Sequence, residues 1–520
     1  MATVSRKKRA AVNILFGYIG QLVTALASFA LRKLFILRLS ETLLGVNAVY
    51  TNILTLLSMA ELGIGTALNF QLYGPVARGE TETVKSYMRL YRRAYHLIAM
   101  VVAVLGLLVI PFLPVICKGA DNLTRRELTL YYLIFLFNTV STYFVSYKYS
   151  LAGAEQRNYI QTNIQSITRV ITVAAQLVIL FTTGSFLLFL LTDAGVQLIS
   201  KIFVSFYLNH RYPCLTDREV APLPAAVRQE VFTQTKALVL HRVGDMLRLQ
   251  TDTVLISSMI QVTVAGRVDN YTLVVGTVSN FVNIAFNSLI TSLGNLVATE
   301  GRKRQYEVFG VYRFCAAWIY GFASVGFLVL LTPLIRLWLG EAWLLPAAAV
   351  GLYLVDFYFK GERVVLSNFK TAAGVFSQDR YLSMLQGIVN LILSILLVQR
   401  IGLTGIYVGT VVSGLIANVT KPVIIYRACF APAHTADTDW NGASAGSYFL
   451  DSVRFLIVTA SVYGICYFLR QYVMPVPTIP SFLLMMVLIT ILFNGVFLLV
   501  FGRTTQAKYL WGVLGRVMKR

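Results

Sequence analysis

The chain has 520 residues, of which 57% are hydrophobic and only 13% are charged. Soluble domains carry about 25% charged residues, so this composition excludes an ordinary soluble enzyme. Lys and Arg number 45 against 23 Asp and Glu, which gives a formal net charge of +22. In a soluble protein that charge would suggest a nucleic-acid partner, but the long apolar runs predict a polytopic membrane protein instead, with no nucleic-acid partner.

Apolar runs along the chain predict where it crosses the membrane. A spanning helix needs roughly 20 mostly apolar residues, and such runs occur about fourteen times in this chain. The expected spans are 11–37, 44–69, 94–116, 128–151, 160–182, 186–207, 237–260, 271–297, 308–332, 345–369, 381–399, 404–428, 449–472 and 481–501. The predicted fold is therefore an all-α polytopic membrane protein.

Basic clusters predict the orientation of these spans. With an even number of spans both termini share one side, and the loops on that side hold most of the Lys and Arg, including Arg6–Arg9 and Arg302–Arg304. Cytoplasmic loops carry such an excess. Both termini are therefore predicted to be cytoplasmic, in a bacterial cell membrane. Besides setting the orientation, these basic clusters are expected to bind anionic membrane lipids.

An internal repeat predicts how the spans are organised. At an offset of 222 residues Tyr131 falls on Tyr353 and Lys148 on Lys370. This offset corresponds to six spans, so the two halves insert in the same orientation and form two six-helix lobes with two helices appended. The predicted parts are an N-terminal lobe (1–211), a cytoplasmic linker (212–236), a C-terminal lobe (237–428), a cytoplasmic loop (429–448) and two further spans with a basic tail (449–520).

The connector that begins near Val84 is predicted to form an amphipathic helix. Tyr87, Met88, Tyr91 and Tyr95 follow Val84 at helical spacing, and basic residues take the opposite face. Such a helix is typical of a membrane interface. We expect it to lie on the inner leaflet or to brace neighbouring spans.

Cations within the spans predict an anionic substrate. Ionisable residues at membrane depth are costly and usually face a cavity or a partner. Arg32, Arg169, Arg248 and Lys360 fall within predicted spans. Because Arg and Lys bind phosphate well, these four residues are the expected substrate-binding residues.

Acids within the spans predict ion coupling. Asp245, Asp252 and Asp356 lie in the same apolar segments and could hold a coupling H⁺ or Na⁺. Alternatively, Asp245–Arg248, Arg248–Asp252 and Asp356–Lys360 are ion pairs within single helices, and Arg32 extends to the outer interface. The sequence contains no catalytic motif, paired metal-ligand motif or cofactor motif, so we expect neither an enzyme nor a bound cofactor.

Several short motifs resemble the oligosaccharide-lipid flippases, which include the polysaccharide and O-antigen exporters. This family belongs to the multidrug/oligosaccharidyl-lipid/polysaccharide exporter superfamily. The resemblance covers roughly residues 10 to 430. It rests on Glu61–Gly65 (ELGIG), Leu72–Ala77 (LYGPVA), Leu90–Tyr95 (LYRRAY), Tyr147-Lys148, Ala154–Arg157 (AEQR), Asp252–Ser257 (DTVLIS) and Ser292–Asn295 (SLGN).

The resemblance implies a V-shaped, two-lobe transporter that works by alternating access. Such a protein moves undecaprenyl-diphosphate-linked oligosaccharide from the inner to the outer leaflet for cell-surface polysaccharide, including lipopolysaccharide. A polysaccharide polymerase and glycosyltransferases are its implied partners. Relatives that flip the peptidoglycan precursor use cavity arginines and two extra C-terminal helices that hold the lipid tail, a role open to 449–472 and 481–501.

Three other functions stay open from the sequence. The chain could be a cation-coupled multidrug exporter of the same superfamily, although such a cavity needs more acids than bases. A membrane glycan polymerase or ligase is a second alternative, against which the short outward loops and the repeat count. The third is an inert scaffold in an envelope-synthesis complex.

Overall fold

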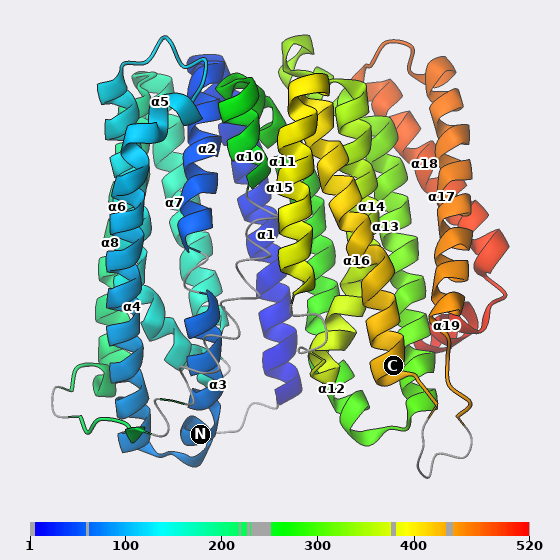
Figure 1. Cartoon of the computed structure of the whole chain (residues 1–520), viewed down its shortest axis with the longest axis horizontal. Coiled ribbons are helices and arrows are strands. Elements are labelled where there is room, and N and C mark those ends of the chain that lie inside the picture. Colours follow the sequence, from blue (N-terminus) through cyan, green and yellow to red (C-terminus); the bar gives the residue numbers. More distant parts are fainter. Residues whose placement is uncertain are drawn as a thin grey trace. The chain divides into compact units, whose positions relative to one another are not determined.

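A computed structural model of the chain describes residues 6–58, 62–155, 157–217, 220–225, 229, 251–375, 381–432 and 440–518. Helices make up the secondary structure of these residues, and no strand occurs among them (Figure 1). This confirms the all-α class. The chain divides into two compact units, Met1–Asp269 and Asn270–Arg520.

The first unit is a bundle of long helices. It contains α1 (Arg6–Arg38), α2 (Glu41–Ser58), α3 (Leu62–Arg78), α4 (Thr81–Val109), α5 (Leu113–Ile116), α6 (Arg125–Ala154), α7 (Tyr159–Thr182), α8 (Phe186–Arg211), α10 (Thr251–Leu255) and the start of α11 (Val262–Ser288). Local sequence sets the helix ends. At the start of α6 the Thr124 hydroxyl accepts from the N–H of Glu127 (3.2 Å), and the Glu127 carboxylate accepts from the N–H of Thr124 (2.8 Å), which is a capping box.

The segment after α10 belongs to the first unit. A π-helical turn, Ile256–Ile260, follows α10, and the N–H of Val262 donates to the carbonyl oxygen of Lys118 (2.8 Å). The sequence assigned this segment to the second lobe. In the structure α10 contacts α2, and the π-helical turn contacts α5. The lobe boundaries expected from the sequence stay a prediction.

The aromatic face of α4 forms part of the core of the first unit. Val84, Tyr87, Met88, Tyr91 and Tyr95 are all buried. The ring of Tyr95 lies 6.3 Å from that of Tyr143 and 6.4 Å from that of Tyr147 on α6. The predicted helix and its apolar face are present, and the burial of that face agrees with the second of the two expectations, a brace between neighbouring spans. Facing aromatic side chains of α6 cover it, and α4 continues without a break to Val109.

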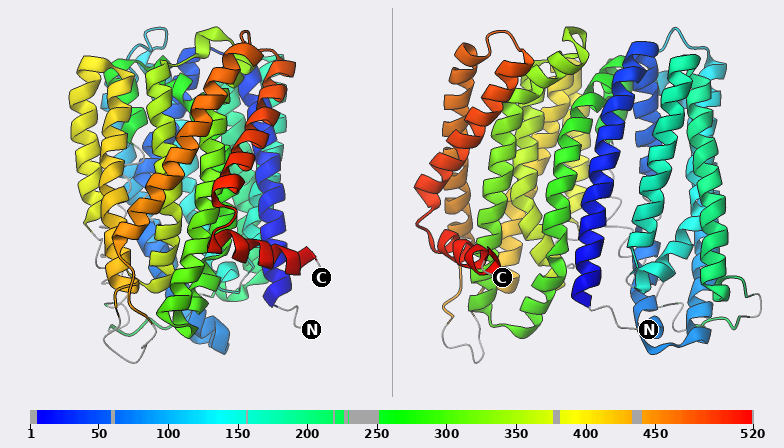
Figure 2. Two further views of the ribbon diagram at one scale, coloured as in Figure 1. Left: turned by 90° about the vertical axis from the view of Figure 1, so that its right-hand side faces the viewer. Right: turned by 180° about the vertical axis from the view of Figure 1, so that it is seen from behind.

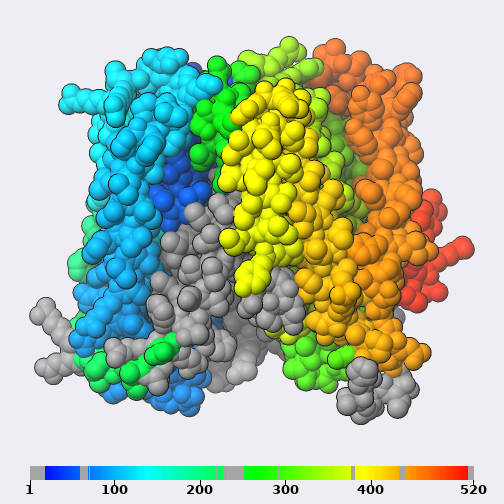
Figure 3. All heavy atoms as spheres, in the orientation of Figure 1, coloured from blue at the N-terminus to red at the C-terminus, as the bar shows by residue number. Residues whose placement is uncertain are grey.

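The opposite face of α4 is exposed and apolar. Leu97, Met100, Val104 and Leu108 are each more than half exposed, and α4 lies at the surface of the first unit in the space-filling view (Figure 3). Exposed aliphatic side chains along a long helix are typical of a surface that contacts lipid.

The second unit contains the rest of α11 and the remaining helices. These are α12 (Ile290–Thr299), α13 (Arg302–Leu339), α14 (Ala347–Ala373), α15 (Leu382–Ile401), α16 (Leu403–Cys429), α17 (Ala445–Val473), α18 (Ile479–Phe501) and α19 (Thr505–Met518). Close packing joins α13 to α14 at Gly361, where an added Cβ would lie 2.2 Å from the ring of Tyr320. Small residues permit such close approach between membrane helices.

The repeat predicted from the sequence appears as the same pairs of neighbours within each unit. In the first unit α4 contacts α6, α6 contacts α8, α7 contacts α8 and α3 contacts α6. At matching positions in the second unit α13 contacts α14, α14 contacts α16, α15 contacts α16 and α12 contacts α14. The matched lysines Lys148 and Lys370 are both buried, at 6% and 7% exposure. The two-fold internal repeat is thereby confirmed.

By length and composition, 11 helical stretches of the described residues could span a membrane. The other three predicted spans have identifiable reasons for being absent from this set. Range 44–69 contains the end of α2, the start of α3 and residues that the structure does not describe. Most of 237–260 also lies outside the described residues. The third, 345–369, coincides with α14, whose interior carries four charged residues at 356, 360, 362 and 363.

The three C-terminal helices, α17, α18 and α19, pack against α13. Helices α17 and α18 form an antiparallel pair, and α19 lies across the end of α18 (Figure 2). A core of aromatic and aliphatic side chains, including Phe314, Phe455, Phe493 and Phe497, joins them. The two appended helices that the sequence predicted are therefore an integral part of the second unit.

Candidate functional site

A polar cavity of about 480 Å³ lies among α1, α6, α7 and α8 of the first unit. Its wall carries two cations, Arg169 and Lys201. The other polar lining residues are uncharged amides and hydroxyls: Gln21, Thr24, Thr142, Ser146, Gln161, Thr162, Gln165, Ser166, Thr168, Gln197 and Ser200. No acidic residue occurs among the described residues that line it. A cationic, hydrogen-bonding wall between membrane helices suits an anion that also carries hydroxyl groups.

Arg169 reaches this cavity from α7. It is half-buried about 15 Å along the helix from Tyr159, at 1.5 Å rise per residue, which places it near the middle of the span. Its guanidinium donates one hydrogen bond, from Nη2 to the hydroxyl of Ser28 on α1 (3.1 Å). No carboxylate of a described residue forms an ion pair with it. Arg169 therefore keeps donors for a ligand, as its predicted role requires.

Lys201 enters the cavity wall from α8 and belongs to a hydrogen-bonded chain. Its ammonium donates to the carbonyl oxygen of Asn138 (2.6 Å), to Asn138 Oδ1 (2.7 Å) and to the hydroxyl of Ser141 (2.9 Å). The amide of Asn138 in turn donates to Asp193 Oδ2 (3.1 Å). Asn138 thus bridges a cation and a carboxylate of the same helix, and the ammonium is held in place at the cavity wall.

Asp193 and Lys201 were not among the site residues predicted from the sequence. Both interrupt the apolar run predicted to span at 186–207, and an ionisable residue inside a span is itself a signal of a site. Asn138, which links them, carries no such signal, because a single amide is common in membrane helices. Only the packing of α6 against α8 reveals that the three residues form one chain.

Arg32 forms an ion pair in the first unit and is not one of the described residues that line the polar cavity. Its Nη2 is 2.6 Å from Asp269 Oδ2, and both side chains are largely buried. Arg267 and Glu41 form a second pair between the same parts of the unit. These two pairs fasten α1 and α2 to the start of α11. The predicted role of Arg32 in substrate binding stays a prediction.

A second charged cluster lies on α14 in the second unit. Asp356 is 2% exposed, with Oδ2 at 2.6 Å from Lys360 Nζ and Oδ1 at 3.7 Å from Arg363 Nη2. Arg363 Nη1 also donates to the carbonyl oxygen of Gly414 on α16 (2.7 Å). The Asp356–Lys360 pair, one of the two interpretations from the sequence, is present. Arg363 was not predicted from the sequence, although it lies seven residues, about two helical turns, after Asp356.

The remaining predicted site residues lie elsewhere. Asp252 is half-buried on the short helix α10. Asp245 and Arg248 fall outside the described residues, so their predicted roles stay predictions. Of the five predicted residues that the structure describes, Asp356 and Lys360 form an ion pair, and Arg169 lines the polar cavity.

Comparisons with known proteins give the fold. No protein-family model matches the sequence, and no curated protein matches it either. Among solved structures, the lipid II flippase MurJ in an inward closed conformation is similar with a TM-score of 0.64 at 13% identity, over 93% of this chain and 99% of that chain. That coverage extends into α17 and beyond, because the 444 residues before α17 are only about 85% of the 520.

Two transporters of the MOP superfamily are also similar. One is a multidrug resistance MATE transporter in an inward-facing conformation, with a TM-score of 0.58 at 12% identity, over 78% of this chain and 96% of that one. The other, from Pyrococcus furiosus, has a TM-score of 0.51 at 14% identity, over 80% and 94%. The chain therefore has the fold shared by MurJ and the MATE transporters. The oligosaccharide-lipid branch that the motifs resemble is not distinguished by this likeness.

Proposed function

We propose that this protein is a transporter that moves a lipid-linked oligosaccharide with an anionic diphosphate across the cytoplasmic membrane by alternating access. The fold supports a transporter, since its solved neighbours include a lipid II flippase in an inward closed conformation and a MATE transporter in an inward-facing conformation. One observation carries the choice of cargo. The polar cavity of the first unit has two cations and no acidic residue among its described lining residues.

The chemistry of the cavity matches the two parts of such a headgroup. The guanidinium of Arg169 can donate two parallel hydrogen bonds to a phosphate, and Lys201 adds a point charge. The glutamines and hydroxyls offer donors and acceptors to sugar hydroxyl groups. In this proposal Arg32, Arg248 and Lys360 are further cations on the path, while Asp245, Asp252 and Asp356 couple transport to H⁺ or Na⁺. The biosynthetic partners implied by the resemblance belong to the same proposal.

The polarity of the cavity disfavours the multidrug alternative. A pump for cationic drugs needs carboxylates where the drug binds, and the described lining of this cavity has none. The similar Pyrococcus furiosus transporter is described by a reverse polarity of its binding pocket that suggests a different function. Pocket polarity, rather than fold, is therefore the feature from which we infer the cargo.

Substitution of Arg169 tests the proposal. The assay is translocation of a fluorescent polyprenyl-diphosphate oligosaccharide in proteoliposomes. Arg169→Gln should lower the rate about tenfold or more, because a hydrogen bond to a charged group contributes about 1.5–3 kcal/mol. Arg169→Lys should recover part of the rate, since lysine restores the positive charge but not the two parallel N–H donors of a guanidinium.

An exposed arginine provides the matched control. Arg78, at the end of α3, has a side chain that is 62% exposed and pairs with Glu80. Arg78→Gln removes the same charge and should leave transport unchanged. Equal rates for the wild type and Arg169→Gln, at equal amounts of folded protein, would contradict the proposal.

A further inference from the structure

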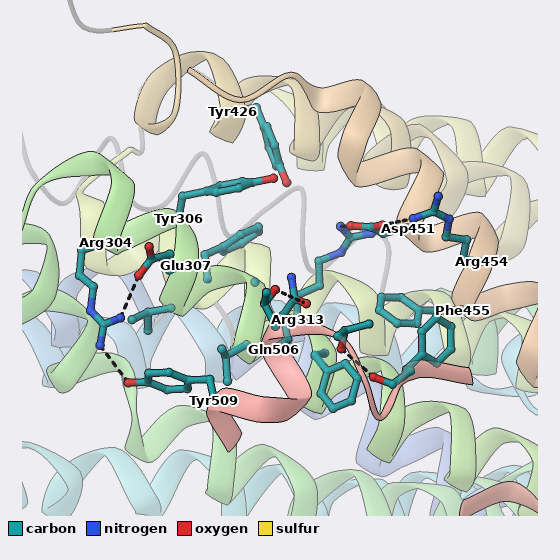
Figure 4. A pocket seen from close by; sticks show the side chains of 18 residues that line it. Arg304, Tyr306, Glu307, Arg313, Tyr426, Asp451, Arg454, Phe455, Gln506 and Tyr509 are labelled. Atoms are coloured by element: carbon teal, nitrogen blue, oxygen red, sulfur yellow. Dashed lines mark hydrogen bonds and ion pairs between the residues drawn. The ribbon is translucent and has the colours of Figure 1, made fainter. Parts of the chain in front are cut away.

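A second cavity, of about 420 Å³, lies in the second unit, apart from every residue proposed for transport. It forms where α13 and α17 begin and where the chain turns from α18 into α19 (Figure 4). The same end of α13 carries the basic cluster Arg302–Arg304. The predicted topology places this end at the cytoplasmic side of the membrane.

Cations exceed acids in the lining of this cavity. Arg304, Arg313 and Arg454 line it, against Glu307 and Asp451. The acids do not neutralise the arginines completely. Arg454 contacts Asp451 at 3.5 Å, but its side chain remains 60% exposed. Arg304 pairs with Glu307 at 2.9 Å and remains 42% exposed. Both guanidinium groups are accessible to a ligand.

Arg313 has a different role in this cavity, because its guanidinium already donates hydrogen bonds within the protein. It is 7% exposed, donates to the carbonyl oxygen of Tyr448 and to the hydroxyl of Ser452 (2.8 Å), and lies 3.7 Å from the centre of the Tyr448 ring. Its charge is fixed at the floor of the cavity by α17. Arg304 and Arg454 therefore form the accessible rim, and Arg313, which also pairs with Asp451 at 3.4 Å, is a fixed, partly neutralised cation below them.

The start of α19 adds further groups that favour an anion. Thr504, Thr505 and Gln506 line the cavity, and the Thr504 hydroxyl caps the helix by accepting from the N–H of Ala507 (3.3 Å). The positive end of a helix dipole favours phosphate. This contribution is secondary to the arginines, which provide full charges.

The rest of the cavity is aromatic. Phe309, Phe314, Phe455 and Phe501 line it beside the charged groups, so one ligand must present both an anion and an apolar part. Helix α19 is itself amphipathic. It buries Ala507 and exposes Tyr509 and Trp511 by 36% and 45%, and aromatic side chains of this kind are enriched at the membrane–water interface.

We infer that this cavity binds the phosphate headgroup of an anionic phospholipid from the cytoplasmic leaflet. Arg304 and Arg454 contact the phosphate, and the acyl chains leave past Tyr509 and Trp511, the exposed aromatic side chains of α19. The hydroxyl of Tyr509, which accepts from Arg304 (3.0 Å), joins the headgroup site to α19. A bound lipid therefore fixes α19 against α13. This inference does not depend on the transported cargo.

Lipid binding to the purified full chain tests the inference. Native mass spectrometry in a neutral detergent measures the affinity for phosphatidylglycerol and for phosphatidylcholine. The wild type should prefer phosphatidylglycerol. Arg454→Gln should weaken that binding about tenfold, which corresponds to about 1.4 kcal/mol for one charge-assisted contact. Adding Arg304→Gln should remove the preference.

The control removes an arginine from the other end of α17. Arg470 lies in the last turn of that helix and does not line the cavity, so Arg470→Gln should bind phosphatidylglycerol like the wild type. Equal binding by the wild type and the double variant would overturn the site, as would equal affinity for the two lipids. Displacement of phosphatidylglycerol by the same concentration of glycerol 3-phosphate would assign the cavity to a soluble phosphate ester and overturn the lipid assignment.

Discussion

Removal of the Asp356 carboxylate should destabilise the second unit, and removal of its partner should restore the stability. Asp356 and Arg363 are 2% and 4% exposed. In Asp356→Ala the buried guanidinium of Arg363 keeps its bond to the Gly414 carbonyl but loses the Asp356 carboxylate. An uncompensated buried charge of this kind costs about 3–5 kcal/mol. The apparent Tm should fall by about 6 °C or more, at roughly 2 °C per kcal/mol.

A double-mutant cycle separates this ion pair from a role in ion coupling. Arg363→Met in the Asp356→Ala background removes the buried charge that has lost the Asp356 carboxylate and should recover most of the lost stability, as measured by thermal unfolding of the purified protein in detergent. Lys360→Met should cost much less, because that side chain is 40% exposed. If Asp356→Ala alone unfolds like the wild type yet abolishes the effect of an ion gradient on transport, the structural reasoning is refuted and the coupling role gains support.

Two further substitutions test packing and buried hydrogen bonding. Gly361→Ala should lower the apparent Tm, because its Cβ would lie 2.2 Å from the ring of Tyr320. Gly351→Ala on the same helix places its Cβ where nothing lies within 4 Å and should be tolerated. Equal Tm values for the two variants would show that α13 and α14 can separate freely. Lys148→Met removes the hydrogen bonds to Ser205 (2.6 Å) and Asn209 (2.9 Å) and should lower the free energy of unfolding by about 1–3 kcal/mol. An unchanged transition would mean that these two hydrogen bonds contribute no net stability.

The sequence predicts the helices and their repetition well, because both depend on local composition. Apolar runs of sufficient length define most spans, and the match of Lys148 with Lys370 identifies the repeat. An ion pair within one helix, such as Asp356–Lys360, is also predictable, since residues four apart share a face. These predictions need no knowledge of which helices are neighbours.

Contacts between helices are beyond the same reasoning. The outer and inner faces of a membrane helix are both apolar, so hydropathy does not reveal how the helix is rotated. This is why the sequence left open whether the apolar face of α4 meets lipid or braces neighbouring spans, whereas the structure packs it against α6. For the same reason the link from Lys201 through Asn138 to Asp193, and the contact of Arg363 with Gly414 on another helix, emerge only from the structure.

The most direct test of the proposed cargo is a comparison of two substrates in the same proteoliposomes. One is a fluorescent polyprenyl-diphosphate oligosaccharide and the other is a cationic dye, each measured with and without a pH or Na⁺ gradient. The lining of the first-unit cavity, which carries cations and no acid among its described residues, predicts that the anionic lipid crosses the membrane and that the dye does not. Efflux of the dye without movement of the lipid would contradict the account and assign the protein to multidrug export.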